Sequence, residues 1–565
     1  MKYDSKKTGS SSLSRHTLNC GHSTTTTTTQ QQQSMTKFLA KNVPLKTKQA
    51  VTEKCVYMCA KDIRPFYFVQ GDGFLELAQE LINVGATHGR VAASSVLPSP
   101  NTVATHCRNL AEEKREELAK QVKEILKKGG KVGMSTDMWT DDFRKIHYLS
   151  ITCHYVTEDF ELIGKNLTTA MFPVDEKKTG DNIKRELVKL LVTKFGFDPL
   201  SLKDIVWVTD QGANVVNALR SYMRLDCMDH VLNTVLRHGL DNDALMQVAP
   251  DFAETVTASK ALVRYVKQSG MTAQLSKTIL QMVDTRFSTV YLTLKSISDI
   301  YAELQDKLEA RGESDRIEKI TPDTLGMLVS FLKPFYDAQR ELEGDKYPTL
   351  HLALLWVERL RHHCQQNAND TAQLAGVRQR HAHWLQEKMA KSVTDLHKTA
   401  TFLWPKFNQL RMLPADQRVN VQQYVKSRLS AAQQPVPEGP GEASQETSAS
   451  SSAAAPAPAA KKTPRFDEWE NVFGVGETES EEDEVDSYVR QRPTMTDDQD
   501  LLGWWKTNSS VYPKLAQLAR QVLCVPASSS SSERVFSVAG RTIEERRTRL
   551  SPSTVDALLF LHDAL

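Results

Sequence analysis

Three consecutive β-patterned stretches between residues 131 and 173 constrain the fold more strongly than any other feature of the sequence. They read KVGMSTDMWT, KIHYLSITCHYVT and FELIGKNLTTAMFP, and short polar turns separate them. Each stretch is rich in the β-branched and aromatic residues that favour strands. Because short turns join neighbouring strands in antiparallel pairs, we expect a three-stranded meander.

Helix and strand patterns alternate after this meander. Residues 179–196 have the apolar period of an amphipathic helix, and residues 204–210 (DIVWVTD) contain an apolar run that predicts a buried strand. A helix from about Asn214, a short strand in YMRLDC and a further helix in HVLNTVLRH follow. The order βββαβαβα is that of an RNase H-like domain. The predicted fold class is therefore α/β plus α, because the flanking regions are helical.

The rest of the chain consists of helical blocks and polar connections. Helical patterns cover about 44–90, 108–129, 242–430 and 498 to the end. Three segments have too few apolar residues to form a core: a Thr/Gln tract (23–34), a Pro/Ala/Ser-rich linker (431–464) and an acidic run (477–486).

Composition limits the class of protein. A chain of 565 residues with 40% hydrophobic residues can form more than one core, because single cores stop growing at roughly 250 to 300 residues. No stretch approaches ~18 consecutive apolar residues, and the N-terminal MKYDSKKTGSSSLSRH lacks the apolar region of a secretory signal. Eight scattered cysteines indicate reduced thiols rather than a disulfide framework. We expect an intracellular protein with no membrane partner.

Basic residues gather near both ends of the chain. Residues 1–50 hold eight Lys/Arg and one Asp, a net charge of +7 (8 − 1), and ERRTRL at 545–550 is a second cluster. Either cluster could bind a polyanion such as DNA, or could be a solvated surface with no partner.

Two carboxylates lie in or directly after predicted strands. Asp137 lies in the first β-patterned stretch, and Asp210 ends the apolar run of 205–208. In this strand order the first and fourth strands are neighbours, and ligands of open sheets gather at the carboxyl ends of strands. Two like charges a few ångström apart resist joint ionisation unless a cation neutralises them, and hard oxygen ligands favour Mg²⁺ or Mn²⁺. Either Asp could instead be a helix cap or a turn residue.

A third carboxylate, Glu533, lies just inside a C-terminal helix that a serine run begins. Val535, Phe536 and Val538 of this helix should face a core. Glu533 could complete the carboxylate site, or could merely favour the helix dipole from the first turn.

Several motifs in combination resemble those of the hAT superfamily of DNA transposases, of the Hermes and hobo type. They are STDMWTD, WVTDQGANVVNAL, CMDH, DTRF, WWKTN and PASSSSSERVFSVAGRTI, and DIRPFYFVQGDGF and LPSP extend the resemblance over most of residues 44–565. The resemblance implies five segments: a basic tail with a partial BED-type zinc finger (1–43), a helical N-terminal domain (44–130), the first part of an RNase H-like core (131–241), an all-α insertion (242–497), and the last part of the core with a dimerisation region (498–565).

The resemblance also implies a reaction and its partners. Asp137, Asp210 and Glu533 would hold two divalent ions, Mg²⁺ or Mn²⁺, which activate a water or hydroxyl for attack on a phosphodiester. The reaction would be DNA strand cleavage, hairpin formation on the flanking DNA and strand transfer. The partners would be double-stranded DNA and further copies of the chain, at least a dimer, in the nucleus.

Four further residues match motifs of this family. Cys227 and His230 match its C-x-x-H motif, and we expect a structural pair close to DNA; a buried Cys and a hydrogen-bonded His without that role fit equally. Arg286 and Phe287 match its Arg-Trp motif, in which the Trp stacks on a flipped base. Phe287 offers a smaller stacking face without an N–H donor, or is an ordinary core aromatic.

The N-terminus resembles only the closing half of a BED-type zinc finger. His16 would be a ligand together with Cys20 or His22, but the opening Cys-x-x-Cys is absent, and two ligands cannot form a tetrahedral structural site. We therefore expect zinc only if a longer form of the protein completes the finger. Cys55 and Cys59 should be core residues.

Two functions remain open. The first is an active cut-and-paste transposase, and the second is a transposase-derived DNA-binding or regulatory dimer without catalysis. The three carboxylates favour the first, because neither DNA binding nor dimerisation requires them. The incomplete finger, Phe287 and the long linker favour the second. In either case, subunit or insertion contacts should cover the apolar faces of the last helical block.

Overall fold

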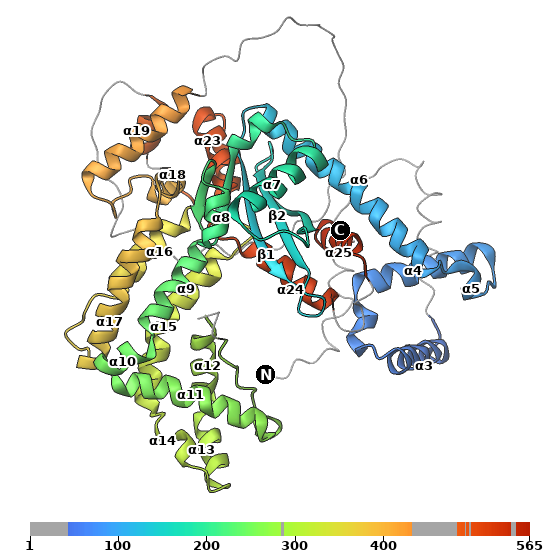
Figure 1. Cartoon of the computed structure of the whole chain (residues 1–565), viewed down its shortest axis with the longest axis horizontal. Helices are drawn as coiled ribbons and strands as arrows, with labels where there is room; N and C mark the ends of the chain where they lie inside the picture. Colours follow the sequence, from blue (N-terminus) through green and yellow to red (C-terminus); the bar gives the residue numbers. More distant parts are fainter. Residues whose placement is uncertain (1–42, 284–287, 432–482, 492, 497–498, 544–549) are drawn as a thin grey trace, which may run out of the picture. The chain divides into compact units, whose positions relative to one another are not determined.

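The computed structural model describes residues 43–283, 288–431, 483–491, 493–496, 499–543 and 550–565 (Figure 1). Contacts divide the chain into two compact units, Met1–Ser99 and Pro100–Leu565. Within the described ranges, no helix is both long enough and apolar enough to cross a membrane.

The N-terminal unit is helical, as the sequence predicts. Its elements are α3 (Leu45–Lys61), η1 (Phe66–Gln70), α4 (Asp72–His88) and α5 (Ala93–Val96). Cys59 is the one buried side chain among residues 43–99, whereas Tyr57, Phe66 and Tyr67 are among many large side chains left exposed. A surface this apolar is typical of an interface, so this unit requires cover from another surface.

A five-stranded mixed sheet organises the larger unit. Its strands are β1 (Val132–Thr140), β2 (His147–Val156), β3 (Leu162–Met171), β4 (Ile205–Thr209) and β5 (Met223–Asp226), in the order β3-β2-β1-β4-β5. The first three strands are antiparallel neighbours, while β4 runs parallel to β1 and β5 parallel to β4. The predicted meander and the α/β plus α class are confirmed.

Outside residues 242–431, the larger unit has helices before, between and after these strands. They are α6 (Pro100–Lys127), α7 (Gly180–Lys189), η2 (Leu190–Lys194), η3 (Pro199–Asp204), α8 (Ala213–Ala218), α9 (Met228–Gly239), α21 (Glu484–Arg490), α22 (Leu501–Asn508), α23 (Pro513–Leu523), α24 (Ser530–Thr542) and α25 (Pro552–Ala564).

Strand β4 shows why its sequence is apolar throughout. Ile205 and Trp207 join one core with α6, α7 and α25, while Val206 and Val208 join a second core that includes α9. Successive residues of a strand point to opposite faces, so a strand covered on both faces needs apolar residues at every position.

Residues 242–431, which we call the helical block, form a large all-α region. Its elements are α10 (Asn242–Val248), α11 (Pro250–Gln268), η4 (Met271–Gln274), α12 (Ser288–Asp299), α13 (Tyr301–Glu309), α14 (Asp315–Glu318), α15 (Pro322–Leu342), α16 (Leu352–His363), α17 (Ala372–Trp384), η5 (Leu385–Ala390), α18 (Asp395–Phe402), η6 (Pro405–Phe407) and α19 (Ala415–Ala431). Its core is continuous with α9, α22 and α23.

The apolar faces of the last helices pack mostly against other parts of the same chain. Trp505 of α22 is buried against the helical block and donates from Nε1 to Leu403 O at 2.9 Å. In contrast, α25 packs on α6 and β3. The expected contacts with the all-α region therefore occur for α22 and α23, whereas the sheet and α6 cover α25.

A buried ion pair joins α6 to α25. Arg115 Nη2 lies 2.8 Å from Asp556 Oδ1 and also donates to Asp556 O at 2.9 Å. The guanidinium of Arg115 lies over the ring of Phe560, 4.6 Å from its centroid. Helix α6 begins at Pro100, before the expected start near 108, because proline is well tolerated in the first turn of a helix.

Candidate carboxylate site

Strand register places Asp137 and Asp210 level with each other. β1 and β4 pair in parallel, with Ser135 opposite Val208. Asp137 and Asp210 each follow two residues later, so the carboxyl ends of two neighbouring strands present two acids. Asp210 comes directly after β4, where the chain passes through Gly212 into α8.

Hydroxyl groups hold the start of α24 against the sheet and so position Glu533. Ser135 Oγ on β1 lies 3.1 Å from Ser531 Oγ and 3.0 Å from Ser532 Oγ. His154 Nε2 on β2 lies 3.2 Å from Ser531 Oγ. Glu533 follows directly, in the first turn of α24. The serine run is therefore a docking segment as well as a helix start.

The carboxyl of Asp137 is strongly perturbed. Its pKa is raised to about 6, chiefly by burial, and the charges of Asp210 and Glu533 add to this effect. A hydrogen bond from Met138 N at 2.7 Å and the nearby His230 act in the opposite direction. The three acids and one imidazole thus lie within electrostatic range of one another, an arrangement that favours a bound cation.

Cys227 and His230 form a hydrogen-bonded pair at the start of α9. His230 Nδ1 lies 3.2 Å from Cys227 Sγ, and Ser529 N donates to the same sulfur at 3.2 Å. The bond with Cys227 raises the pKa of His230, burial opposes this, and the charges of Glu533 and Asp229 raise it further. His230 Nε2 lies 3.7 Å from Glu533 Oε1, so a cationic imidazole faces the acids.

Sequence reasoning missed one acid, Asp229. The ligand atoms of Asp229, His230 and Glu533 all lie within 4.8 Å of one another, in a group that could hold a metal ion. Asp137 and Asp210 are not members of this tight group. Asp229 is only 4% exposed, and its carboxylate accepts from Gln339 Nε2 at 2.8 Å. Because Gln339 lies 110 residues away in sequence, no local pattern could have indicated this contact.

Four residues singled out in the sequence lie outside the described residues. Arg286 and Phe287 fall in the gap before α12, and His16 and Cys20 fall in the N-terminal segment. Their roles remain expectations from the sequence.

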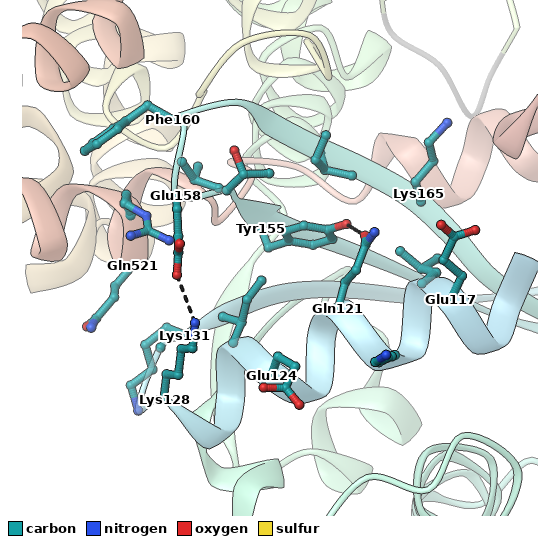
Figure 2. A pocket seen from close by; sticks show the side chains of 18 of the residues that line it. Glu117, Gln121, Glu124, Lys128, Lys131, Tyr155, Glu158, Phe160, Lys165 and Gln521 are labelled. Carbon is teal, nitrogen blue, oxygen red and sulfur yellow. Dashed lines mark hydrogen bonds and ion pairs between the residues drawn. The ribbon is translucent and has the colours of Figure 1, made fainter. Parts of the chain in front are cut away.

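A large groove lies away from these acids. It has a volume of about 1390 Å³ and lies between α6, the connection from β2 to β3, and α23. Figure 2 shows charged side chains of both signs along it, including Lys128, which pairs with Glu158 at 3.0 Å. Lys131, which precedes β1, lines the groove, whereas Asp137 lies in the carboxyl half of that strand. The groove is therefore separate from the carboxylate site.

Two protein-family models match the chain at its ends. Residues 484–565 match the hAT family C-terminal dimerisation region, and residues 39–102 match the Hermes transposase DNA-binding domain. The chain thus carries a region of the DNA-binding type and a region of the dimerisation type.

Similar curated proteins span most of the chain. The Transposable element Hobo transposase of Drosophila melanogaster is 27% identical over 534 residues, which cover 88% of this chain and 80% of that protein. Zinc finger protein 618 of Homo sapiens is 24% identical over 538 residues, 92% of this chain and 51% of that protein. The Putative AC transposase of Zea mays is 24% identical over 543 residues, 88% of this chain and 63% of that protein. The chain therefore spans about half of zinc finger protein 618 and most of the Hobo transposase.

Along the sequence, one family region precedes the strands and the helical block and the other follows them, and the similarity to the Hobo transposase covers most of the chain. By these similarities the chain belongs to the hAT transposase superfamily.

Proposed function

We propose that this chain is a hAT-type DNA transposase, or a protein derived from one, that cleaves and transfers DNA strands at a metal-dependent site. Asp137, Asp210 and Glu533 are the proposed catalytic residues. The observation that carries the proposal is that three separate elements, β1, the end of β4 and α24, bring these acids to one region of the sheet. Neither DNA binding nor dimerisation requires such a group of half-buried acids.

The strand order supports a core of the RNase H-like type. Three antiparallel strands are followed by two strands parallel to β1, with helices between them, in the arrangement that the sequence predicts. In this proposal the core has a first part over 131–241 and a last part over 498–565. The all-α insertion of 242–497 separates the two parts, so that Glu533 reaches the site from far along the chain.

The side chains present suit a hard divalent cation. Carboxylate oxygens are the ligands that Mg²⁺ and Mn²⁺ prefer. When bound, such ions activate a water or hydroxyl nucleophile and stabilise the leaving oxygen of a phosphodiester. Asp210 Oδ1 accepts from Gly212 N at 3.1 Å and Asp137 Oδ1 from Met138 N at 2.7 Å, which orients both acids. His230 lies beside these acids, with Nε2 3.7 Å from Glu533 Oε1, and a cationic imidazole there would favour a DNA phosphate.

The partners follow from the family regions. We propose double-stranded DNA as the substrate, a homo-oligomer of at least two chains, and the nucleus as the site of action. The exposed Tyr57, Phe66 and Tyr67 of the N-terminal unit fit a protein partner. Zinc would bind through His16 and Cys20 only if a longer form supplied the two missing ligands.

A catalytically inactive DNA-binding regulator is the alternative. Two similar proteins are named outside the transposases, zinc finger protein 618 and the Putative transcriptional regulator tpeD of Talaromyces stipitatus, the latter 21% identical over 574 residues. Phe287, at the position of the family's Trp, agrees with this alternative. The reaction itself distinguishes the two functions.

The test is cleavage of a labelled DNA duplex that carries the terminal sequences flanking the gene of this chain. Wild-type protein should nick it and form hairpins in Mg²⁺ or Mn²⁺ and not in EDTA. Asp210→Asn and Glu533→Gln should abolish cleavage while keeping the melting midpoint and DNA binding of the wild type. Asp243→Asn, on exposed α10, is the matched control and should cleave normally.

Full cleavage by Glu533→Gln would remove that residue from the site. Specific binding of the duplex by the wild type, without cleavage in either metal, would favour the regulatory alternative.

A further inference from the structure

A buried carboxylate links the candidate site to the helical block. Asp229 lies next to His230 on α9, and its two oxygens accept from two side-chain amides. Gln339 Nε2 donates to Oδ1 at 2.8 Å, and Asn233 Nδ2 donates to Oδ2 at 3.2 Å. Gln339 belongs to α15, so this contact joins the helical block to the acids of the sheet.

The orientation of Gln339 is set by this contact. Its Nε2 also donates to Asn233 Oδ1 at 2.9 Å, so one amide group serves two acceptors. Its Oε1 is buried without a hydrogen-bond partner among the described residues. Reversing the amide would turn its oxygen toward the Asp229 carboxylate, which is repulsive. The side chain therefore keeps its donor toward Asp229 even though its own acceptor stays unsatisfied.

The start of α9 is in turn bonded to the segment that leads into α24. Met228 N donates to Ala527 O at 2.9 Å, and Ser529 N donates to Cys227 Sγ at 3.2 Å. Residues 527–529 immediately precede the helix of Glu533. A displacement of Asp229 would therefore reach both His230, its neighbour, and the docking segment of α24.

We propose that Gln339 is a positioning residue, which fixes Asp229 and thereby holds His230 opposite Glu533. The inference rests on the proposed function, because the acids that it arranges are those proposed to act on DNA. It goes further by making the helical block part of the cleavage machinery: a movement of α15 changes the geometry of the carboxylate site. In this role Gln339 acts through its bonds to Asp229 and Asn233.

Other contacts of α15 let the effect of Gln339 be separated from general packing. Ser528 Oγ donates to Leu342 O at 3.0 Å, and Arg534 Nη1 donates to Glu343 O at 2.9 Å. Both bonds use backbone oxygens, so neither involves the side chain of Gln339. When a side-chain substitution of Gln339 leaves these two bonds intact, a change in the segment before Glu533 is transmitted through Asp229 and α9.

The test compares Gln339→Met with a matched control. Methionine keeps the length of the side chain and removes both donated bonds. The control is Gln373→Met, since Gln373 Nε2 donates to Asp251 Oδ2 at 2.7 Å between two helices of the same block. Amide hydrogen exchange over 227–234 and 526–536 should be at least fivefold faster in Gln339→Met than in wild type. Both regions should be unchanged in the control.

Two further readouts separate positioning from loss of stability. The Mn²⁺ concentration that gives half-maximal cleavage should rise at least fivefold in Gln339→Met, with a melting midpoint close to that of the control. The double variant Asp229→Asn with Gln339→Glu exchanges the amide and the carboxylate, so that an amide donor at position 229 again faces a carboxylate acceptor at position 339. It should return slow exchange to both regions, whereas Gln339→Glu alone sets two carboxylates against each other and should exchange fastest.

The inference would be overturned if amide hydrogen exchange over 526–536 were as slow in Gln339→Met as in the wild type. It would also be overturned if the variant had a lower melting midpoint but required the same Mn²⁺ concentration for half-maximal cleavage. A wild-type protein that neither binds Mn²⁺ nor cleaves DNA would defeat the proposed function. The exchange measurements would still decide the role of Gln339 in that case, since they need neither metal nor DNA.

Discussion

Replacing Asp137 by Asn should stabilise the folded protein at neutral pH. The folded state raises the pKa of this carboxyl from its ordinary value of 3.8 to about 6, so ionised Asp137 opposes folding. Burial and the charges of Asp210 and Glu533 cause this effect, and an amide at position 137 avoids all three. The Asn side chain can still accept the hydrogen bond from Met138 N.

The magnitude follows from the two pKa values. A tenfold change in proton affinity corresponds to about 1.4 kcal/mol, so a rise from 3.8 to about 6 corresponds to about 3 kcal/mol. The sign depends on pH: a raised pKa means that the folded state binds the proton more tightly, so the stability contributed by Asp137 is complete below about pH 4 and is lost as the pH rises to about 6. Above that range Asp137→Asn should be more stable by about 3 kcal/mol.

The assay is urea unfolding of wild type and Asp137→Asn at pH 4 and pH 7.5, in EDTA. The two proteins should have similar midpoints at pH 4 and should differ at pH 7.5, with the variant more stable. Added Mg²⁺ should then stabilise the wild type more than the variant, because the cation offsets the charges of the acids. An equal difference between the proteins at both pH values, or a less stable variant at pH 7.5, would refute the electrostatic reasoning.

Three other changes probe packing and DNA contacts. Arg115→Met should lower the free energy of unfolding by about 3 to 5 kcal/mol, because Asp556 stays buried without its main ion partner, and urea denaturation measures this. Phe287→Trp should maintain or raise the hairpin yield on gels and Phe287→Ala should reduce it, since stacking is worth ~1 to 3 kcal/mol, whereas equal yields would make Phe287 a bystander. Deleting residues 1–42 should reduce the salt dependence of DNA affinity measured by fluorescence anisotropy, and an unchanged slope would exclude phosphate contacts there.

Local patterns accounted for the sheet and for two of its acids. The meander and the apolar run before Asp210 follow from strand periodicity and short turns, which act between near neighbours in sequence. In this strand order, the positions of Asp137 and Asp210 follow from the parallel pairing of β1 and β4. The sequence therefore predicts the position of a residue when the strand pattern and the order of the strands are enough to define that position.

Contacts between distant segments could not be predicted in this way. Arg115 and Asp556 lie 441 residues apart, and Gln339 and Asp229 lie 110 residues apart. Each pair is buried and in contact only in the folded chain, and each of the four residues alone resembles an ordinary charged or polar helix residue. The serine run before Glu533 predicts the start of a helix. Its hydrogen bonds to β1 and β2 could not be predicted, because they form only when the sheet is complete.

The most direct test of the carboxylate site is anomalous scattering from Mn²⁺ in crystals of the protein bound to a DNA end. The arrangement of β1, β4 and α24 predicts manganese within about 2 Å of oxygens from Asp137, Asp210 and Glu533, beside a DNA phosphate. Manganese bound only at Asp229 and His230, or no manganese near Asp137 and Asp210, would contradict the proposed site.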